Sequence, residues 1–240
     1  MQRRDFLFGT AGALATSTIV RPARAAATIA PTVAIELFTS QACAACPPAD
    51  QLLGELARDP SVVALAWHVD YWNRRGWTDP FATRLGGERP HAYASRLGAE
   101  IYTPALVAGG ARLVIGYERD SVRTAMQTAP AASVPVTFVP QGAPGGDGFA
   151  VEVGAAGQQV SALLALYQPE HVTDVESGEN GGRQLHEYRI VREAMFLGFW
   201  DGAPKRLTLP PLPEGLGAAV LVQATDLRIL GAGELRLPVG

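Results

Sequence analysis

The sequence predicts an α/β domain followed by a small all-β, sandwich-like domain. In the first part, an apolar run from Val33 to Phe38 precedes a Cys-x-x-Cys loop and an amphipathic segment. Such a continuous apolar run is typical of a strand buried on both faces. From Val134 onward, short apolar segments alternate with Gly/Pro turns, which favours a sandwich of about seven short strands. Because only a short linker separates the two parts, we expect domains at residues 26–129 and 134–240.

Residues 1–25 are expected to be an export signal. Arg3-Arg4 is a twin-arginine dipeptide before a mildly apolar run, and Ala23-Arg24-Ala25 is a small-x-small cleavage site. The run is too short and too rich in Gly and Thr to anchor the chain in a bilayer, although an uncleaved N-terminal anchor is the alternative. We therefore expect a periplasmic or secreted protein, exported by the twin-arginine route into a compartment that permits disulfides.

The composition of the mature chain argues against several classes of partner. Loss of residues 1–25 removes four arginines and one aspartate, which leaves a moderately acidic protein. It has no Lys/Arg cluster or stripe, so nucleic acid is not an expected partner. It has no second apolar run of membrane length, so no membrane contact is expected in the mature form. Phosphate-loop and dinucleotide fingerprints are also missing, and no organic cofactor is predicted.

Cys43 and Cys46 are the two cysteines of the chain, and we interpret them as its reactive centre. They lie at an expected helix start, where unpaired N–H groups and a partial positive charge favour a thiolate. Cys43 would be the nucleophile and Cys46 the resolving thiol. Two alternatives stay open: a metal site and a structural disulfide. A structural bridge across so small a loop would contribute only about 2 kcal/mol in the loop-closure model.

The elements around this loop follow from local patterns. The helix after the cysteines is expected to begin at Cys46, with Pro47 at its first position. A second helical region, to about Leu97, is expected to be capped by Asp79. The remaining elements of the first domain are a strand over Val62 to Val69, a strand headed by Thr103-Pro104, its antiparallel partner over Arg112 to Ile115 and a helix over Glu118 to Met126.

Glu36 is the polar exception in the first strand. A carboxylate in a buried strand is costly unless it is paired, protonated or near an edge. One interpretation makes Glu36 a buried acid that relays a proton to Cys46. The other is that Glu36 points to an exposed face or pairs with an arginine.

Two further functions compete with redox chemistry. His68 ends the second strand, so Cys43, Cys46 and His68 could bind Cu(I) or Zn²⁺ together. The chain could also be a non-catalytic exported binding protein that uses the cluster of Trp67, Trp72 and Trp77, although aromatic runs are more often part of a core.

The arrangement resembles the thioredoxin superfamily, in which Cys-x-x-Cys opens the first helix and Thr103-Pro104 would head the third strand. The resemblance implies a thioredoxin-like fold for residues 26–129 and a cis Thr103–Pro104 bond that faces the cysteines and positions the substrate. It also implies a catalytic role for Glu36 as the buried acid. The implied activity is thiol–disulfide exchange between a Cys43–Cys46 disulfide and protein or small thiol substrates, without a metal or other cofactor. The redox partner is not implied.

A closer resemblance covers nearly the whole mature chain. Its motifs are similar to those of a family of uncharacterised exported thioredoxin-like proteins that is catalogued as a domain of unknown function. The motifs are Glu36 to Gln41, Cys43 to Asp50, His68 to Trp72, and Gly178-Glu179-Asn180 with Arg183. This resemblance implies a fold and an exported location, but no reaction.

Overall fold

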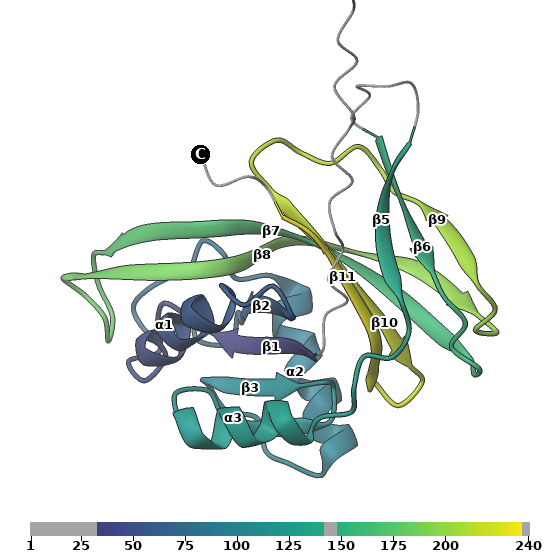
Figure 1. Cartoon of the computed structure of the whole chain (residues 1–240). Helices are drawn as coiled ribbons and strands as arrows, with labels where there is room; N and C mark the ends of the chain where they lie inside the picture. The colour runs from purple at the N-terminus through teal and green to yellow at the C-terminus, as the bar shows by residue number, and fades with distance from the viewer. Residues whose placement is uncertain (1–32, 142–147, 237–240) are drawn as a thin grey trace, which may run out of the picture.

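The computed structural model describes residues 33–141 and 148–236 (Figure 1). The expected export signal, residues 1–25, lies outside the described residues. Within the described ranges, no helix has the length and apolar character needed to cross a membrane. The first seven elements are β1 (Val33–Thr39), α1 (Pro47–Leu56), β2 (Val62–His68), α2 (Arg84–Leu97), β3 (Ala105–Ala108), β4 (Arg112–Ile115) and α3 (Arg119–Thr128). The strands that follow are β5 (Val136–Gln141), β6 (Gly148–Val153), β7 (Val160–Val175), β8 (Arg183–Trp200), β9 (Lys205–Thr208), β10 (Gly217–Ala224) and β11 (Ile229–Leu235).

The order of elements from β1 to α3 is the predicted one, but α2 begins later than expected. Thr83 is its N-cap, and the Thr83 hydroxyl accepts the Gly86 N–H at 3.0 Å. Asp79 is not available as a cap, because its carboxylate accepts the backbone N–H groups of Gln41 and Phe81. The side chain predicted to start a helix therefore belongs to a buried polar cluster.

The strands form one eight-stranded sheet and one three-stranded sheet. The large sheet has the order β11-β10-β7-β8-β2-β1-β3-β4, and the small one the order β5-β6-β9. β1 and β2 are parallel, whereas β3 runs antiparallel to β1. β8 joins β2 through the single pair Ala66↔Ile190. The two predicted segments therefore meet within one sheet, and the fold class and its division into two domains stay predictions.

Two apolar cores cover opposite faces of β1. Ile35 and Leu37 pack with Leu53 of α1, in a cluster that also contains residues of α3. Phe38 faces the other way and packs with Trp67 and with Tyr93 of α2. A third core lies between the small sheet and the strands β7, β10 and β11. The alternation along β1 decides which of its side chains face α1 and which face α2.

The long β7–β8 hairpin reaches over α1 and β2 (Figure 1). Gly54 allows α1 to approach β8 closely, because a Cβ atom at this position would lie 2.5 Å from the ring of Tyr188. The hairpin thereby brings residues from the second half of the chain to the loop that follows β1.

Candidate functional site

Cys43 and Cys46 form a disulfide in the loop between β1 and α1. Cys46 is the N-cap of α1 and Pro47 follows as its first residue, as predicted. The Cys46 N–H donates to the Cys43 carbonyl oxygen at 3.1 Å, which keeps the loop tight. Cys43 is 1% exposed and Cys46 is fully buried, whereas Ala44 and Ala45 between them are exposed. The pair therefore lies beneath the surface at a helix N-terminus.

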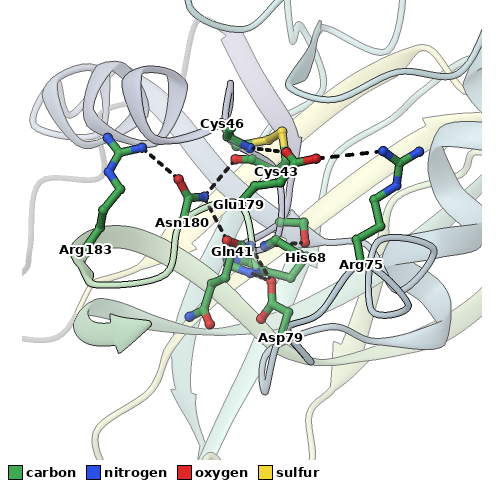
Figure 2. Close-up of a disulfide and its surroundings, with 12 residues drawn as sticks. Gln41, Cys43, Cys46, His68, Arg75, Asp79, Glu179, Asn180 and Arg183 are labelled. Atoms are coloured by element: carbon green, nitrogen blue, oxygen red, sulfur yellow. Dashed lines mark hydrogen bonds and ion pairs between the residues drawn. A yellow bond between two sulfur atoms is a disulfide. The ribbon is translucent and has the colours of Figure 1, made fainter. Parts of the chain in front are cut away.

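The turn between β7 and β8 covers this loop. Asn180 is fully buried, and its side-chain amide donates to the carbonyl oxygens of Gln41 (2.8 Å) and Cys43 (3.0 Å). Its own carbonyl accepts a hydrogen bond from Arg183 at 2.7 Å. Figure 2 shows Asn180 between Arg183 and the main chain of the cysteine loop. Neighbouring Glu179 accepts the Ala44 N–H at 3.2 Å.

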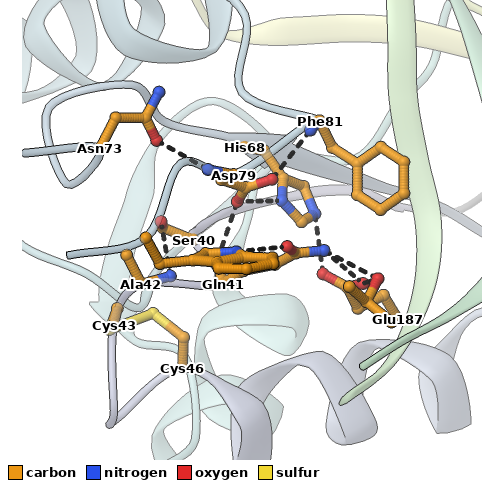
Figure 3. Close-up of polar contacts among 12 residues, drawn as sticks. Ser40, Gln41, Ala42, Cys43, Cys46, His68, Asn73, Asp79, Phe81 and Glu187 are labelled. Carbon is orange, nitrogen blue, oxygen red and sulfur yellow. Dashed lines mark hydrogen bonds and ion pairs between the residues drawn. A yellow bond between two sulfur atoms is a disulfide. The ribbon is translucent and has the colours of Figure 1, made fainter. Parts of the chain in front are cut away.

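Gln41 connects the cysteine loop to a polar cluster behind it (Figure 3). Its side-chain amide donates to Thr173 at 2.9 Å and to Glu187 at 2.8 Å, and its carbonyl accepts the indole N–H of Trp77. The Gln41 backbone N–H donates to Asp79 at 2.8 Å. Gln41 thus joins the segment after β2 to the β7–β8 hairpin.

His68 is buried among carboxyl groups on the far side of Gln41 from the disulfide (Figures 2 and 3). Its Nδ1 lies 2.7 Å from Asp79, and its Nε2 lies 3.8 Å from Glu187 without a hydrogen-bond partner. Burial alone would lower the pKa of His68, but the negative charge of Asp79, and less strongly that of Glu187, raises it to about 8. His68 is therefore charged at neutral pH and lowers the pKa of Asp79 against the effect of burial.

Asp50 is a buried carboxyl group on the first turns of α1. Desolvation raises its pKa to about 8, and the nearby charge of His68 offsets this only in part. Within the described residues no lysine or arginine pairs with Asp50. Since residues four apart lie on the same face of a helix, Asp50 follows Cys46 by one turn on one face. Sequence reasoning assigned Asp50 no role, although its spacing from Cys46 was a usable signal.

Glu36 faces α2, on the opposite side of β1 from α1. Its fully buried carboxylate accepts two hydrogen bonds from Arg89, at 2.7 and 2.9 Å, and one from Tyr93. Gln223 of β10 contacts both Arg89 and Tyr93. The sequence allowed Glu36 to be either a proton-relaying acid or the partner of an arginine. In the structure it forms an ion pair with Arg89. Its expected catalytic role stays a prediction that this geometry does not favour.

The Thr103–Pro104 peptide bond is cis, which confirms that expectation. Pro104 is buried immediately before β3, and its carbonyl oxygen accepts the Gly116 N–H at 2.9 Å. The Thr103 hydroxyl is buried without a hydrogen-bond partner. A role of these two residues in positioning a substrate stays a prediction.

The metal site considered as an alternative stays a prediction. In the part of the chain that the structure describes, no group of three or more His, Cys, Asp and Glu side chains is arranged to hold a metal ion. The two sulfur atoms are bonded to each other, and the His68 ring is held between Asp79 and Glu187.

Comparison with known proteins gives a family but no activity. A family described as "Protein of unknown function (DUF1223)" matches residues 34–223. The chain is also similar to the crystal structure of protein AGR_C_4864 from Agrobacterium tumefaciens, with 30% identity and a TM-score of 0.74, over 89% of this chain and 100% of that one. An endonuclease/exonuclease/phosphatase from Beutenbergia cavernae matches 43% of this chain and 27% of its own, at 16% identity and a TM-score of 0.15, which supports no argument. No curated protein matches the chain.

Proposed function

The chain belongs to the DUF1223 family of proteins of unknown function, and we propose that it is an exported thiol–disulfide oxidoreductase acting through Cys43 and Cys46. The observation that carries the proposal is a bonded cysteine pair at the start of α1 with the buried carboxyl group of Asp50 one turn farther on. A purely structural disulfide needs no such acid, and burying a carboxyl group without a cation partner costs stability. Strongly perturbed acids of this kind are typical of sites that transfer protons.

In the oxidising direction, the reaction takes two electrons from two substrate thiols. A substrate thiolate attacks Sγ of Cys43, the Cys43–Cys46 bond breaks, and Cys46 leaves as a thiolate that takes the proton of Asp50. The second substrate thiolate then attacks the substrate sulfur of the mixed disulfide, which forms the substrate disulfide and releases Cys43 as a thiolate.

In the reducing direction the same groups act in reverse. The Cys43 thiolate attacks a substrate disulfide and releases one substrate thiolate. The Asp50 carboxylate accepts the Cys46 proton, and the Cys46 thiolate attacks Sγ of Cys43, which closes the protein disulfide and releases the second substrate thiolate. Asp50 thus takes the proton-transfer role that the sequence suggested for Glu36.

The order of the first seven elements and the cis Thr103–Pro104 bond support a thioredoxin-like arrangement for residues 33–129. In that arrangement Thr103 and Pro104 would bind the backbone of a protein substrate or a small thiol beside Cys43. The disulfide supplies the redox chemistry, so the reaction needs no metal or organic cofactor. Export by the twin-arginine route would place the chain where substrate disulfides form.

The test combines a redox titration with trapping. In glutathione buffers of increasing reducing strength, the Cys43–Cys46 pair should titrate as a two-electron couple within the range of known exchange enzymes, about −120 to −270 mV. A Cys46→Ala variant should accumulate mixed disulfides at Cys43, and a Cys43→Ala, Cys46→Ala double variant should accumulate none. A pair that neither exchanges with glutathione nor forms a mixed disulfide would rule out the proposal.

A further inference from the structure

The turn between β7 and β8 makes contacts that thiol–disulfide exchange does not itself require. We call Ser177–Asn180 the hairpin tip. The Ser177 hydroxyl donates to the carbonyl oxygen of Gly76 at 2.6 Å, and Asn180 binds two carbonyl oxygens of the cysteine loop. Glu179 accepts the Ala44 N–H. The hairpin tip, which is distant from the cysteines in the sequence, is thereby held against the loop that contains the disulfide.

Glu179 places a carboxylate beside Cys43. The Ala44 nitrogen, whose N–H donates to Glu179 at 3.2 Å, is joined to Cys43 Sγ only through the Cβ, Cα and carbonyl carbon of Cys43. A thiolate is stabilised by nearby N–H donors and positive charge, and is destabilised by negative charge. The Glu179 carboxylate accepts the Ala44 N–H, which is then no longer free to stabilise a thiolate at Cys43. It also adds a negative charge near that thiolate.

Arg75 supplies an opposing charge. Its guanidinium group lies 3.8 Å from the Glu179 carboxylate, and both side chains are partly exposed, at 62% for Arg75 and 40% for Glu179. Figure 2 shows the Glu179 carboxylate beside the cysteine loop, with Arg75 on its other side. Charges this exposed are screened by water and salt, so their effects on Cys43 should be moderate and should depend on ionic strength.

We propose that Glu179 tunes the reactivity of Cys43, disfavouring its thiolate and thereby favouring the disulfide, with Arg75 acting in the opposite direction. The inference deepens the function proposed above and rests on it for its biological meaning. Glu179 is a positioning residue in this scheme, since it acts through the Ala44 N–H and not on the substrate. By reciprocity, a thiolate at Cys43 weakens the hydrogen bond between Glu179 and Ala44, so reduction loosens the hairpin tip.

The test measures the Cys43 thiol directly in a Cys46→Ala background. Glu179→Gln removes the charge but keeps a carbonyl oxygen that can accept the Ala44 N–H. We expect a lower pKa for the Cys43 thiol and alkylation about threefold faster at neutral pH and low salt, with the difference shrinking at high salt. Arg75→Gln should raise the pKa and slow alkylation. Glu176→Gln, which removes an exposed acid from the same turn, is the matched control and should change neither.

The outcomes separate this inference from the proposed function. If Glu179→Gln and Glu176→Gln give the same thiol pKa, or if Glu179→Gln raises it, the inference is wrong even where the wild-type pair exchanges with glutathione. If the thiol pKa moves as expected while the wild-type pair exchanges with no thiol, the electrostatic role stands and the oxidoreductase proposal fails. Opposite shifts from Glu179→Gln and Arg75→Gln would also exclude general disruption of the fold as the cause.

Discussion

Asp50 and Cys46 lie one helical turn apart on α1, and the Asp50 N–H donates to the Cys46 carbonyl oxygen at 3.2 Å. Because the pKa of Asp50 is raised to about 8, its carboxyl group holds a proton at neutral pH. A protonated acid one helical turn from the residue whose sulfur leaves as a thiolate is suited to general acid catalysis. Glu36 is the other buried acid near the loop in sequence, but its negative charge is compensated by Arg89.

Asp50→Asn should therefore slow exchange without preventing disulfide formation. The amide cannot give a proton to Cys46 or take one from it, so we expect a loss of about a hundredfold, at the lower end of general acid–base effects. The pH profile of the exchange rate should also lose an ionisation near pH 8. Stopped-flow reduction of the disulfide measures both. Glu55→Gln, an exposed acid on the same helix, is the control, and an equal loss in both variants would contradict the assignment.

The buried cluster also predicts how stability changes with pH. The pKa values of Asp50 and His68 are both raised in the fold, from 3.8 and 6.5 to about 8. The stabilisation tied to each bound proton is thus complete below its unfolded pKa and is lost as pH rises through about 8. We expect wild-type stability to fall from about pH 4 to pH 8, and Asp50→Asn to reduce that fall by up to about 5 kcal/mol. Urea unfolding across this range is the measurement, and an unchanged slope in Asp50→Asn would show that Asp50 ionises normally.

Local patterns in the sequence were sufficient to predict β1, the cysteine loop and the start of α1. Pro47 lacks the N–H that a first helical position leaves unpaired, and the apolar run before the loop is typical of a buried strand. Seven strands follow α3, as expected from the apolar segments between turns, but β7 (16 residues) and β8 (18 residues) are far longer than the short strands predicted. β1, the cysteine loop and the start of α1 are determined by residues adjacent in the sequence, so local patterns are enough to predict them.

The partners of the site could not be predicted, because they are far apart in the sequence. Asn180 binds the carbonyl oxygen of Cys43 across 137 positions, and Gln41 reaches Glu187 across 146. Nothing in the pattern of β8 indicates that it pairs with β2, since the two share a single residue pair. Asp50 likewise lies near His68 and near Glu187 of β8, both distant in the sequence, so its burial could not be predicted from the pattern of α1.

Asn180→Ala should open the cysteine loop. The change removes the acceptor of Arg183 and the two hydrogen bonds to main-chain oxygens, and it leaves those two buried oxygens unsatisfied, at a cost of about 2 to 3 kcal/mol. With the hairpin tip released, Cys43 should become accessible to large thiols as well as small ones. The ratio of reduction rates by a bulky and a small thiol measures this access. Gln184→Ala in the same hairpin is the control, and an unchanged ratio in Asn180→Ala would mean that the tip does not limit access.

Glu36 and Arg89 should matter for stability and not for exchange. The pair is buried between β1 and α2, so removing one partner leaves an uncompensated charge, and Arg89→Met should cost about 3 to 5 kcal/mol. Replacing both, as Glu36→Leu with Arg89→Met, removes the unpaired charge and should recover part of that loss. The pH profile of disulfide reduction should keep its ionisation near pH 8 in the double variant, since Asp50 is unchanged and lies on the other side of β1. Loss of that ionisation would count against Asp50 and return the proton-transfer role to Glu36.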